Sequence, residues 1–208
     1  MNDSGHDVGR WGIARRFAAA LLINVALLIV PGGVVCAAEV AGVRVAPTAR
    51  VGGVDLVLNG AGLRRFLFVD VYVIGMYFVE RTGSARVAID APGPKRISLI
   101  FTREVTAQSL IDALFEGIRD NSTEAEFNKL KGPADALSTI MRQLRVAKKG
   151  DIVALDYLPG AGVGVVMNGQ LIGSPVPNPD LYRALLKIWL GEVPINADLK
   201  RELLLGPV

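Results

Sequence analysis

Apolar and polar residues follow a pattern that predicts β-strands along the first half of the chain after residue 38. Runs rich in Val, Ile, Phe and Tyr are separated there by Gly or Pro. The predicted strands are residues 40–45, 54–58, 66–80, 86–89 and 97–101. The segment 66–80 is apolar at almost all odd and even positions, so we expect both of its faces to be covered by other elements.

The second half of the chain shows the 3.6-residue period of amphipathic helices. An apolar stripe that starts after Thr106 predicts a helix with this residue as its N-cap. Asn121 together with Glu124 predicts a second, short helix that ends at Gly132, and Pro133 predicts the start of a third. The remaining predicted elements are strands at 152–157 and 163–167, a helix opened by Asn178-Pro179-Asp180, and a last helix at 196–205.

This order of elements predicts an α+β fold. We expect a largely antiparallel sheet with helices packed on one of its faces. No internal repeat and no linker interrupts residues 39–208, which we predict to form one domain.

The first 38 residues have the three-part order of a secretory signal peptide. Basic residues come first, an apolar run of 14 residues follows at 17–30, and small residues end the segment at Ala37 and Ala38. The run is shorter than the ~20 residues that span a bilayer. We therefore predict a signal peptide at 1–38 and an exported, periplasmic protein with no stable membrane span after processing. A retained N-terminal anchor is the alternative.

Composition excludes several classes of function. The chain is 51% hydrophobic and 21% charged, with a net charge of +3, and it has one cysteine and one histidine. Both Cys36 and His6 precede residue 39, so the mature domain has no disulfide, no histidine-dependent catalytic triad and no histidine zinc ligand. We predict no metal and no cofactor. The charges are scattered, which does not favour nucleic-acid binding.

Arg64 and Tyr72 are the candidate ligand-binding residues. Arg64 enters the most apolar segment of the chain, and its guanidinium could hold a carboxylate through two parallel hydrogen bonds. Tyr72 has the same parity, but a straight strand would place it about 26 Å away, at ~3.3 Å per residue. The two residues can share a ligand only if the chain bends or folds back between 65 and 69. The alternative is a surface arginine at a strand end.

Other conspicuous residues have structural interpretations. Gly160-Ala-Gly162-Val-Gly164 precedes a strand-like run and not a helix, so a hairpin loop is favoured over a nucleotide-binding loop. Asn59 to Gly62 is predicted to form a turn, and Asp70 to pair with an arginine. Trp189 is predicted to lie in the core. The pairs Lys95-Arg96 and Lys148-Lys149 are predicted to be solvated.

Five segments together resemble the chalcone isomerase-like family, in particular its bacterial exported branch. They are LNGAGLR at 58–64, VYVIGMY at 71–77, REVT at 103–106, PGAG at 159–162 and IWLGE at 188–192. The first two are the most specific, and the resemblance covers nearly the whole mature chain. It implies an open-faced β-sandwich, in which a curved antiparallel sheet is covered by helices with a ligand cleft between them.

The resemblance also implies which residues contact a ligand. The arginine and tyrosine that grip a carboxylate in fatty-acid-binding members fall on Arg64 and Tyr72. The tyrosine, asparagine and threonine of the isomerases fall on Leu110, on Gly117 and near Ile188. The chain thus keeps the anion site and lacks the polar groups that orient a chalcone, which argues against flavonoid cyclisation and for no catalytic residues.

Three hypotheses for function follow. The preferred one is a non-catalytic periplasmic protein that binds a fatty acid or a similar amphiphilic carboxylate; the sequence leaves its oligomeric state open, with a monomer as the default. The second is a cofactor-independent isomerase or lyase that acts on a conjugated substrate. The third is an envelope interaction protein whose cleft is filled by its own side chains.

Overall fold

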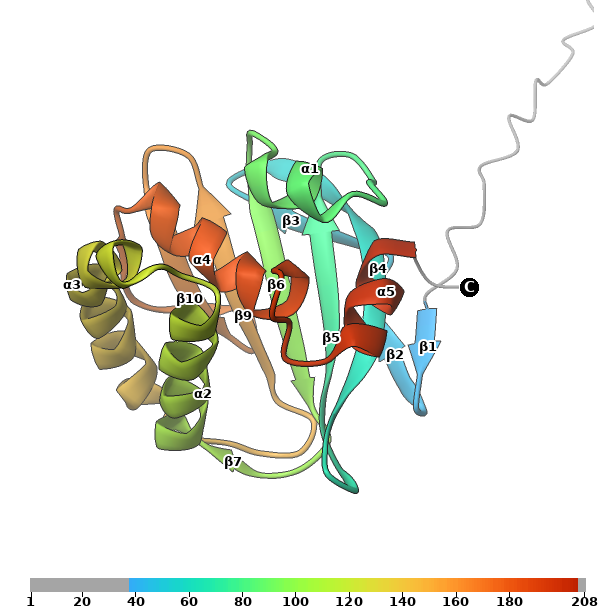
Figure 1. Cartoon of the computed structure of the whole chain (residues 1–208). Coiled ribbons are helices and arrows are strands. Elements are labelled where there is room, and N and C mark those ends of the chain that lie inside the picture. The colour runs from blue at the N-terminus through green and yellow to red at the C-terminus, as the bar shows by residue number, and fades with distance from the viewer. Residues whose placement is uncertain (1–37, 206–208) are drawn as a thin grey trace, which may run out of the picture. The chain divides into compact units, whose positions relative to one another are not determined.

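The computed structural model describes residues 38–205 (Figure 1). The predicted signal peptide lies outside these residues apart from Ala38, so the signal peptide and the export that it implies stay predictions. Within the described range, no helix is both long enough and apolar enough to cross a membrane.

The fold is built on a seven-stranded antiparallel sheet with the strand order β11-β10-β9-β6-β5-β4-β3. Its strands are β3 (Thr48–Val51), β4 (Val54–Phe66), β5 (Val69–Phe78), β6 (Lys95–Phe101), β9 (Ile152–Leu158), β10 (Gly162–Met167) and β11 (Gln170–Val176). Two small ribbons accompany the sheet, namely β1 (Ala38–Val40) with β2 (Val43–Val45) and β7 (Val105–Thr106) with β8 (Val146–Ala147).

Helices cover one face of this sheet (Figure 1). They are α1 (Ala85–Asp90), α2 (Ala107–Asp120), α3 (Glu124–Met141), α4 (Pro179–Leu190) and α5 (Ala197–Leu205), with a 3-10 turn at Arg142–Leu144. Thr106 and Asn178 cap α2 and α4 by accepting hydrogen bonds from the backbone N–H groups of Ser109 and Leu181. The α+β fold, the sheet and the helices on one face are confirmed.

Two apolar clusters lie on opposite faces of β5. Tyr72, Ile74, Met76 and Phe78 belong to the larger cluster, which the sheet shares with α2, α3 and α4. The smaller cluster on the other face consists of Val45, Val51, Leu56, Leu58, Ala61, Val73 and Tyr77. The prediction that this segment is covered on both faces is therefore confirmed from Tyr72 onward.

The segment 66–80 is nevertheless not one strand. The chain turns back at Leu67-Phe68, and Phe66 pairs with Val69 across the turn. Neither turn residue is Gly, Asn, Asp or Pro, so the usual turn signal is missing. Residues 86–89 were also predicted wrongly, because Ser84 caps a helix there by accepting a hydrogen bond from the backbone N–H of Val87.

The predicted break between two helices at Gly132-Pro133 is wrong as well. Thr123 and Glu126 form a capping box, and α3 continues from there through Pro133. The buried residues Leu130 and Leu137 lie on either side of the proline. We infer that their burial outweighs the one backbone hydrogen bond that proline removes.

Two further corrections concern strands and charges. Strand β11 was not predicted at all.

The prediction that Lys95 and Arg96 are solvated is wrong. Lys95 is 3% exposed, and Arg96 forms a half-buried ion pair with Asp156 at 2.6 Å. Lys148 and Lys149 are exposed, as predicted.

Asn59 to Gly62 is not a turn but the central part of β4, where a β-bulge at Asn59 interrupts the pairing with β5. The buried Asn59 amide donates hydrogen bonds to the carbonyls of Thr82 and Leu203, at 3.1 and 2.7 Å. Gly60 and Gly62 lie directly under α5. A side chain at either position would occupy the space of this helix, so the two glycines permit its close approach.

We predict that Gly60→Ala destabilises the protein by about 2 kcal/mol, because the new Cβ would overlap the backbone carbonyls of Glu202 and Leu203. Urea denaturation measures the change. Gly132→Ala is the matched control, because a Cβ there meets no neighbouring atom within 4 Å. This exposed helical substitution should raise the free energy of unfolding by up to about 1 kcal/mol. Equal effects of the two substitutions would contradict the packing argument.

Lys95 is a buried amine at the start of β6. Its Nζ donates a hydrogen bond to the carbonyl of Ile89 at 2.8 Å. The pKa of Lys95 is lowered to about 8, mainly by burial and also by the positive charge of Arg183, while Asp90 opposes the shift. Below about pH 8 the folded protein therefore holds a poorly solvated ammonium group, which costs stability.

Between the folded pKa of about 8 and the usual lysine value of 10.5, the unfolded chain keeps the proton that the folded protein has lost. The free energy of unfolding must then rise with pH. We predict that wild type gains about 2 kcal/mol relative to Lys95→Met between about pH 7 and pH 10. Urea titrations of both proteins across this range test this, and a constant difference would refute it.

Candidate functional site

The β4–β5 hairpin brings Arg64 and Tyr72 together. The chain folds back at Leu67-Phe68, which meets the condition that the sequence left open, and Arg64 becomes the cross-strand partner of Tyr72. Side chains that lie directly opposite in an antiparallel pair share one face of the sheet, with Cβ atoms about 5 Å apart. Tyr72 points into the larger apolar cluster, so Arg64 lies on the face that the helices cover.

A β-bulge next to this pair separates the roles of the two neighbouring arginines. Arg64 pairs with Tyr72 and Arg65 with Asp70, so that Val71 is the extra residue of β5. Arg65 forms an ion pair with Asp70 at 2.7 Å, with both side chains largely exposed. The predicted pairing of Asp70 with an arginine is confirmed. Its partner is Arg65, so Arg64 is not engaged by Asp70.

The Arg64 side chain is half-buried. One of its nitrogens donates a hydrogen bond to the carbonyl of Arg65, and its guanidinium lies over the ring of Phe66 at 5.9 Å from the ring centroid. Among residues 38–205 it forms no ion pair with a carboxylate. Its charge is therefore not neutralised by an acidic side chain of this part of the chain.

Tyr72 is 6% exposed, and its hydroxyl accepts a hydrogen bond. The indole Nε1 of Trp189 donates to the Tyr72 hydroxyl at 3.2 Å, and Phe101 packs edge-on at 5.9 Å. Burial raises the pKa of Tyr72, while the Trp189 hydrogen bond and the positive charge of Arg64 oppose this shift. The phenol is thus neutral at pH 7.

The neighbours of this phenol determine what it can bind. An indole N–H is a donor only, so the Tyr72 oxygen accepts from Trp189, and the proton of the Tyr72 hydroxyl is not used in this contact. The phenol O–H and the guanidinium can therefore both donate to a third group. A carboxylate, which only accepts hydrogen bonds, matches such a pair.

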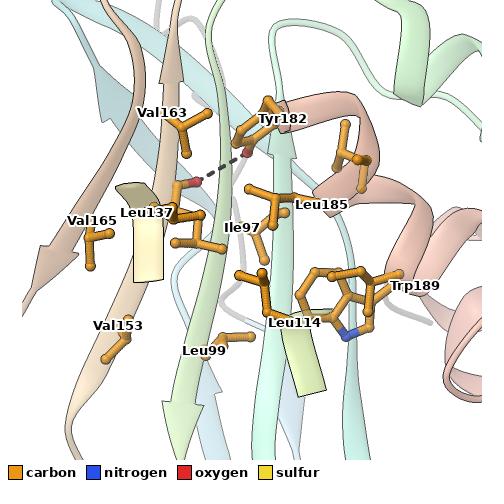
Figure 2. Close-up of a cluster of buried hydrophobic side chains, with 14 of the residues drawn as sticks. Ile97, Leu99, Leu114, Leu137, Val153, Val163, Val165, Tyr182, Leu185 and Trp189 are labelled. Atoms are coloured by element: carbon orange, nitrogen blue, oxygen red, sulfur yellow. Dashed lines mark hydrogen bonds between the residues drawn. The ribbon is translucent and has the colours of Figure 1, made fainter. Parts of the chain in front are cut away.

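An apolar cavity lies next to Tyr72, between the sheet and helices α2 and α4. Figure 2 shows Leu185 and Trp189 of α4 directed toward Ile97 and Leu99 of β6. The cavity has a volume of about 60 Å³. It is lined by Tyr72, Leu99, Leu110, Ala113, Leu114, Met141, Val153, Leu155, Leu185, Ile188, Trp189 and Ile195.

This volume is far below the roughly 300 to 1,000 Å³ of small-molecule sites. A long ligand would fit only if α2 or α4 moved away from the sheet. The cavity lining is almost entirely apolar, and the side chains that separate the two helices from the sheet are mostly aliphatic. The apolar lining of the cavity thus suits a hydrocarbon chain, but in this closed structure the cavity is too small to hold one.

The positions that the resemblance assigns to isomerase side chains lie in and next to this cavity. Leu110 and Ile188 line it, and Gly117 packs against Ile188, with a virtual Cβ on Gly117 only 2.8 Å from the Ile188 Cγ2 atom. None of the three side chains has a polar atom. They can contact a hydrocarbon and cannot orient a phenolate.

Trp189 was predicted to be a core residue, which it is, but its contact with Tyr72 was not predicted. A buried indole needs a hydrogen-bond acceptor, so the sequence could have indicated that Trp189 has a polar partner. The 117 residues between the two positions leave that partner unspecified. The packing of α4 on the sheet decides it.

A wider groove of about 760 Å³ lies where α1, α4 and the end of α2 meet the start of α5. Its charged side chains are of both signs, including Arg86, Asp90, Glu126, Lys187 and Lys200. This composition is typical of a solvated surface groove, and the groove contains neither Arg64 nor Tyr72.

Comparisons with known proteins agree with this fold. A fatty-acid-binding protein from Arabidopsis thaliana has a similar crystal structure, with a TM-score of 0.63 and 18% sequence identity over 78% of this chain and 92% of that chain. At this identity the likeness concerns the fold. No curated protein matches the chain in sequence. The model of the chalcone isomerase-like family, in contrast, matches residues 37–205, and the chain therefore belongs to the chalcone isomerase-like family.

Proposed function

We propose that this protein binds a fatty acid or a similar amphiphilic carboxylate without catalysis, in the periplasm, after removal of residues 1–38. The observation that carries the proposal is the pairing of Arg64 with Tyr72 beside an apolar cavity. The similar Arabidopsis structure, described as a fatty-acid-binding protein, supports the same ligand class.

The carboxylate is held by two donors from neighbouring strands. Arg64 supplies a positive charge, and the Tyr72 hydroxyl supplies a neutral O–H whose pKa burial has raised. Charge-assisted hydrogen bonds of this kind contribute about 1.5 to 3 kcal/mol each when water is largely excluded. Trp189 keeps the Tyr72 oxygen in place through its indole N–H.

The tail enters between the sheet and α2 and α4, where Leu110, Ile188 and Trp189 make an apolar lining. Each buried methylene contributes about 0.8 kcal/mol, so a tail of a dozen methylenes supplies roughly 10 kcal/mol. The free-energy cost of separating the helices from the sheet offsets part of this stabilisation. Ligand-dependent opening is thus a component of the proposal.

The small size of the cavity is the one observation that favours a rival function, an envelope interaction protein without a ligand. Titration with fatty acids separates the two, because the rival expects no saturable binding. The isomerase hypothesis is less favoured. The side chains of Leu110, Gly117 and Ile188 offer no polar group that could orient a substrate.

We predict that Arg64→Ala weakens fatty-acid binding by about 10- to 100-fold, through loss of a charge-assisted hydrogen bond. Tyr72→Phe should weaken it by about tenfold. Isothermal titration calorimetry with a long-chain fatty acid measures both effects.

Arg65→Ala is the matched control, because this neighbouring arginine forms an exposed ion pair with Asp70. It should leave the affinity within about a factor of two. Equal losses in Arg64→Ala and Arg65→Ala would mean that only the general positive charge matters. Absence of binding by wild type would end the proposal.

Chain length tests the tail site separately from the carboxylate site. Affinity should rise about fourfold for each added methylene until the opened cavity is full. Ala113→Phe, which places a ring in the cavity lining, should shorten the longest chain that still gains affinity. Ala136→Phe on the exposed face of α3 should not. The same chain-length dependence in both variants would place the tail elsewhere.

A further inference from the structure

The tip of the β4–β5 hairpin exposes four consecutive apolar side chains. Phe66 is 61% exposed, Leu67 77%, Phe68 98% and Val69 41%. Other exposed large apolar residues of the described chain do not form such a run, and single ones need no explanation. Four consecutive exposed apolar side chains at a projecting turn indicate a surface that contacts a binding partner when the protein functions.

The turn itself is an unusual place for these residues. Two-residue hairpin turns favour Asn, Asp and Gly, which adopt a positive φ at low cost and are polar. Here the turn is Leu67-Phe68, and Leu67 has φ +53°. Solvation disfavours a large apolar side chain at both positions, and the positive φ disfavours leucine at the first. Turn formation does not account for this choice.

Basic side chains lie around the tip. Arg64 and Arg65 precede it on β4, and two loops from the same end of the sheet add further charges. The backbone N–H of Thr102 bonds to the carbonyl of Val71, and that of Gly150 to the carbonyl of Phe101, which places both loops beside the base of the hairpin. The exposed basic residues of these loops are Arg103, Lys148 and Lys149.

Acidic groups at this end of the sheet are fewer and partly engaged. Asp70 is paired with Arg65, and Asp151 accepts hydrogen bonds from the Lys148 N–H and the Asn168 amide. Glu104 is the third. Leaving aside the half-buried Arg64, four exposed basic residues therefore accompany three acidic ones around an apolar tip.

We propose that this tip docks on the surface of an anionic phospholipid membrane. The apolar side chains enter the boundary between head groups and acyl chains, and the exposed basic residues Arg65, Arg103, Lys148 and Lys149 contact lipid phosphates. Apolar insertion combined with attraction to anionic head groups is how proteins attach to a membrane surface without spanning it. Arg64 and Tyr72 lie at the inner end of the same hairpin, so docking orients their cavity toward a source of amphiphiles.

The shape of the tip favours a membrane over a protein partner. The hairpin projects from the end of the sheet, beside the loops that follow β6 and β8 (Figure 1). A stable protein interface uses about 20 to 30 residues a side, whereas a bilayer accepts a small convex apolar tip without a matching pocket. A second copy of the chain would need a concave apolar site of its own.

The test compares the binding of wild type and variants to lipid vesicles. Each protein is purified from its host after export. Wild type should co-sediment with vesicles that contain phosphatidylglycerol, more weakly with phosphatidylcholine alone, and less at high salt. Leu67→Ser combined with Phe68→Ser should lower the ratio of bound to free protein by about tenfold or more. Leu171→Ser combined with Val193→Ser, two residues that are each 55% exposed elsewhere, should leave it unchanged.

A second readout follows the tip itself. A polarity-sensitive fluorophore on Phe68→Cys, in the processed protein whose residues 39–208 contain no other cysteine, should shift to the blue on addition of vesicles, and the same fluorophore on Leu171→Cys should not. Absence of vesicle binding, equal binding by the two serine variants, or a label at position 68 that stays in water would each overturn the proposal.

Membrane docking does not depend on the proposed fatty-acid site. In solution, the combined Leu67→Ser and Phe68→Ser protein should bind fatty acids like wild type, because neither side chain lines the cavity or stacks on Arg64. A self-associated wild-type protein that these substitutions dissociate, with no vesicle binding, would identify a second copy as the occupant and overturn the membrane proposal.

Discussion

The pairing of β4 with β5 is the constraint on which the rest of the candidate site depends. A two-residue turn at Leu67-Phe68 and a bulge at Val71 set the register that places Arg64 opposite Tyr72. A shift of one residue would turn the arginine to the other face of the sheet, away from the helices. The hairpin also sends one end into the core and the other into solvent, so the ligand site and the exposed tip share one element.

Helices from the C-terminal half of the chain then provide the surroundings of the Arg64–Tyr72 pair. Helix α5 packs closely over Gly60 and Gly62 and leaves Arg64 as the next residue of that face. Helix α4 brings Trp189 to the Tyr72 hydroxyl and closes the cavity. A half-buried guanidinium lies opposite a buried phenol, and among the described residues Arg64 forms no ion pair with a carboxylate. Such an arrangement favours an incoming anion.

The narrow cavity and the exposed hairpin tip suggest a common physical picture. Closed apolar packing between the helices and the sheet keeps water out when no ligand is present, and a hydrocarbon tail can replace those contacts at small net cost. An amphiphile is scarce in water and abundant in a membrane. A protein that takes such a ligand would gain from an apolar tip and basic residues on the strand pair that carries the proposed carboxylate site.

The sequence by itself determined the features that depend on neighbouring residues. These are the α+β class, the helix starts at Thr106 and Asn178, and the apolar character of both faces of β5, because caps and periodicity act within a few residues. Tertiary structure decided the turn without turn residues, the burial of Lys95, the continuity of α3 through Pro133 and the contact of Trp189 with Tyr72. Each of these depends on packing between segments far apart in the chain, where the energy of burial overrides local preference.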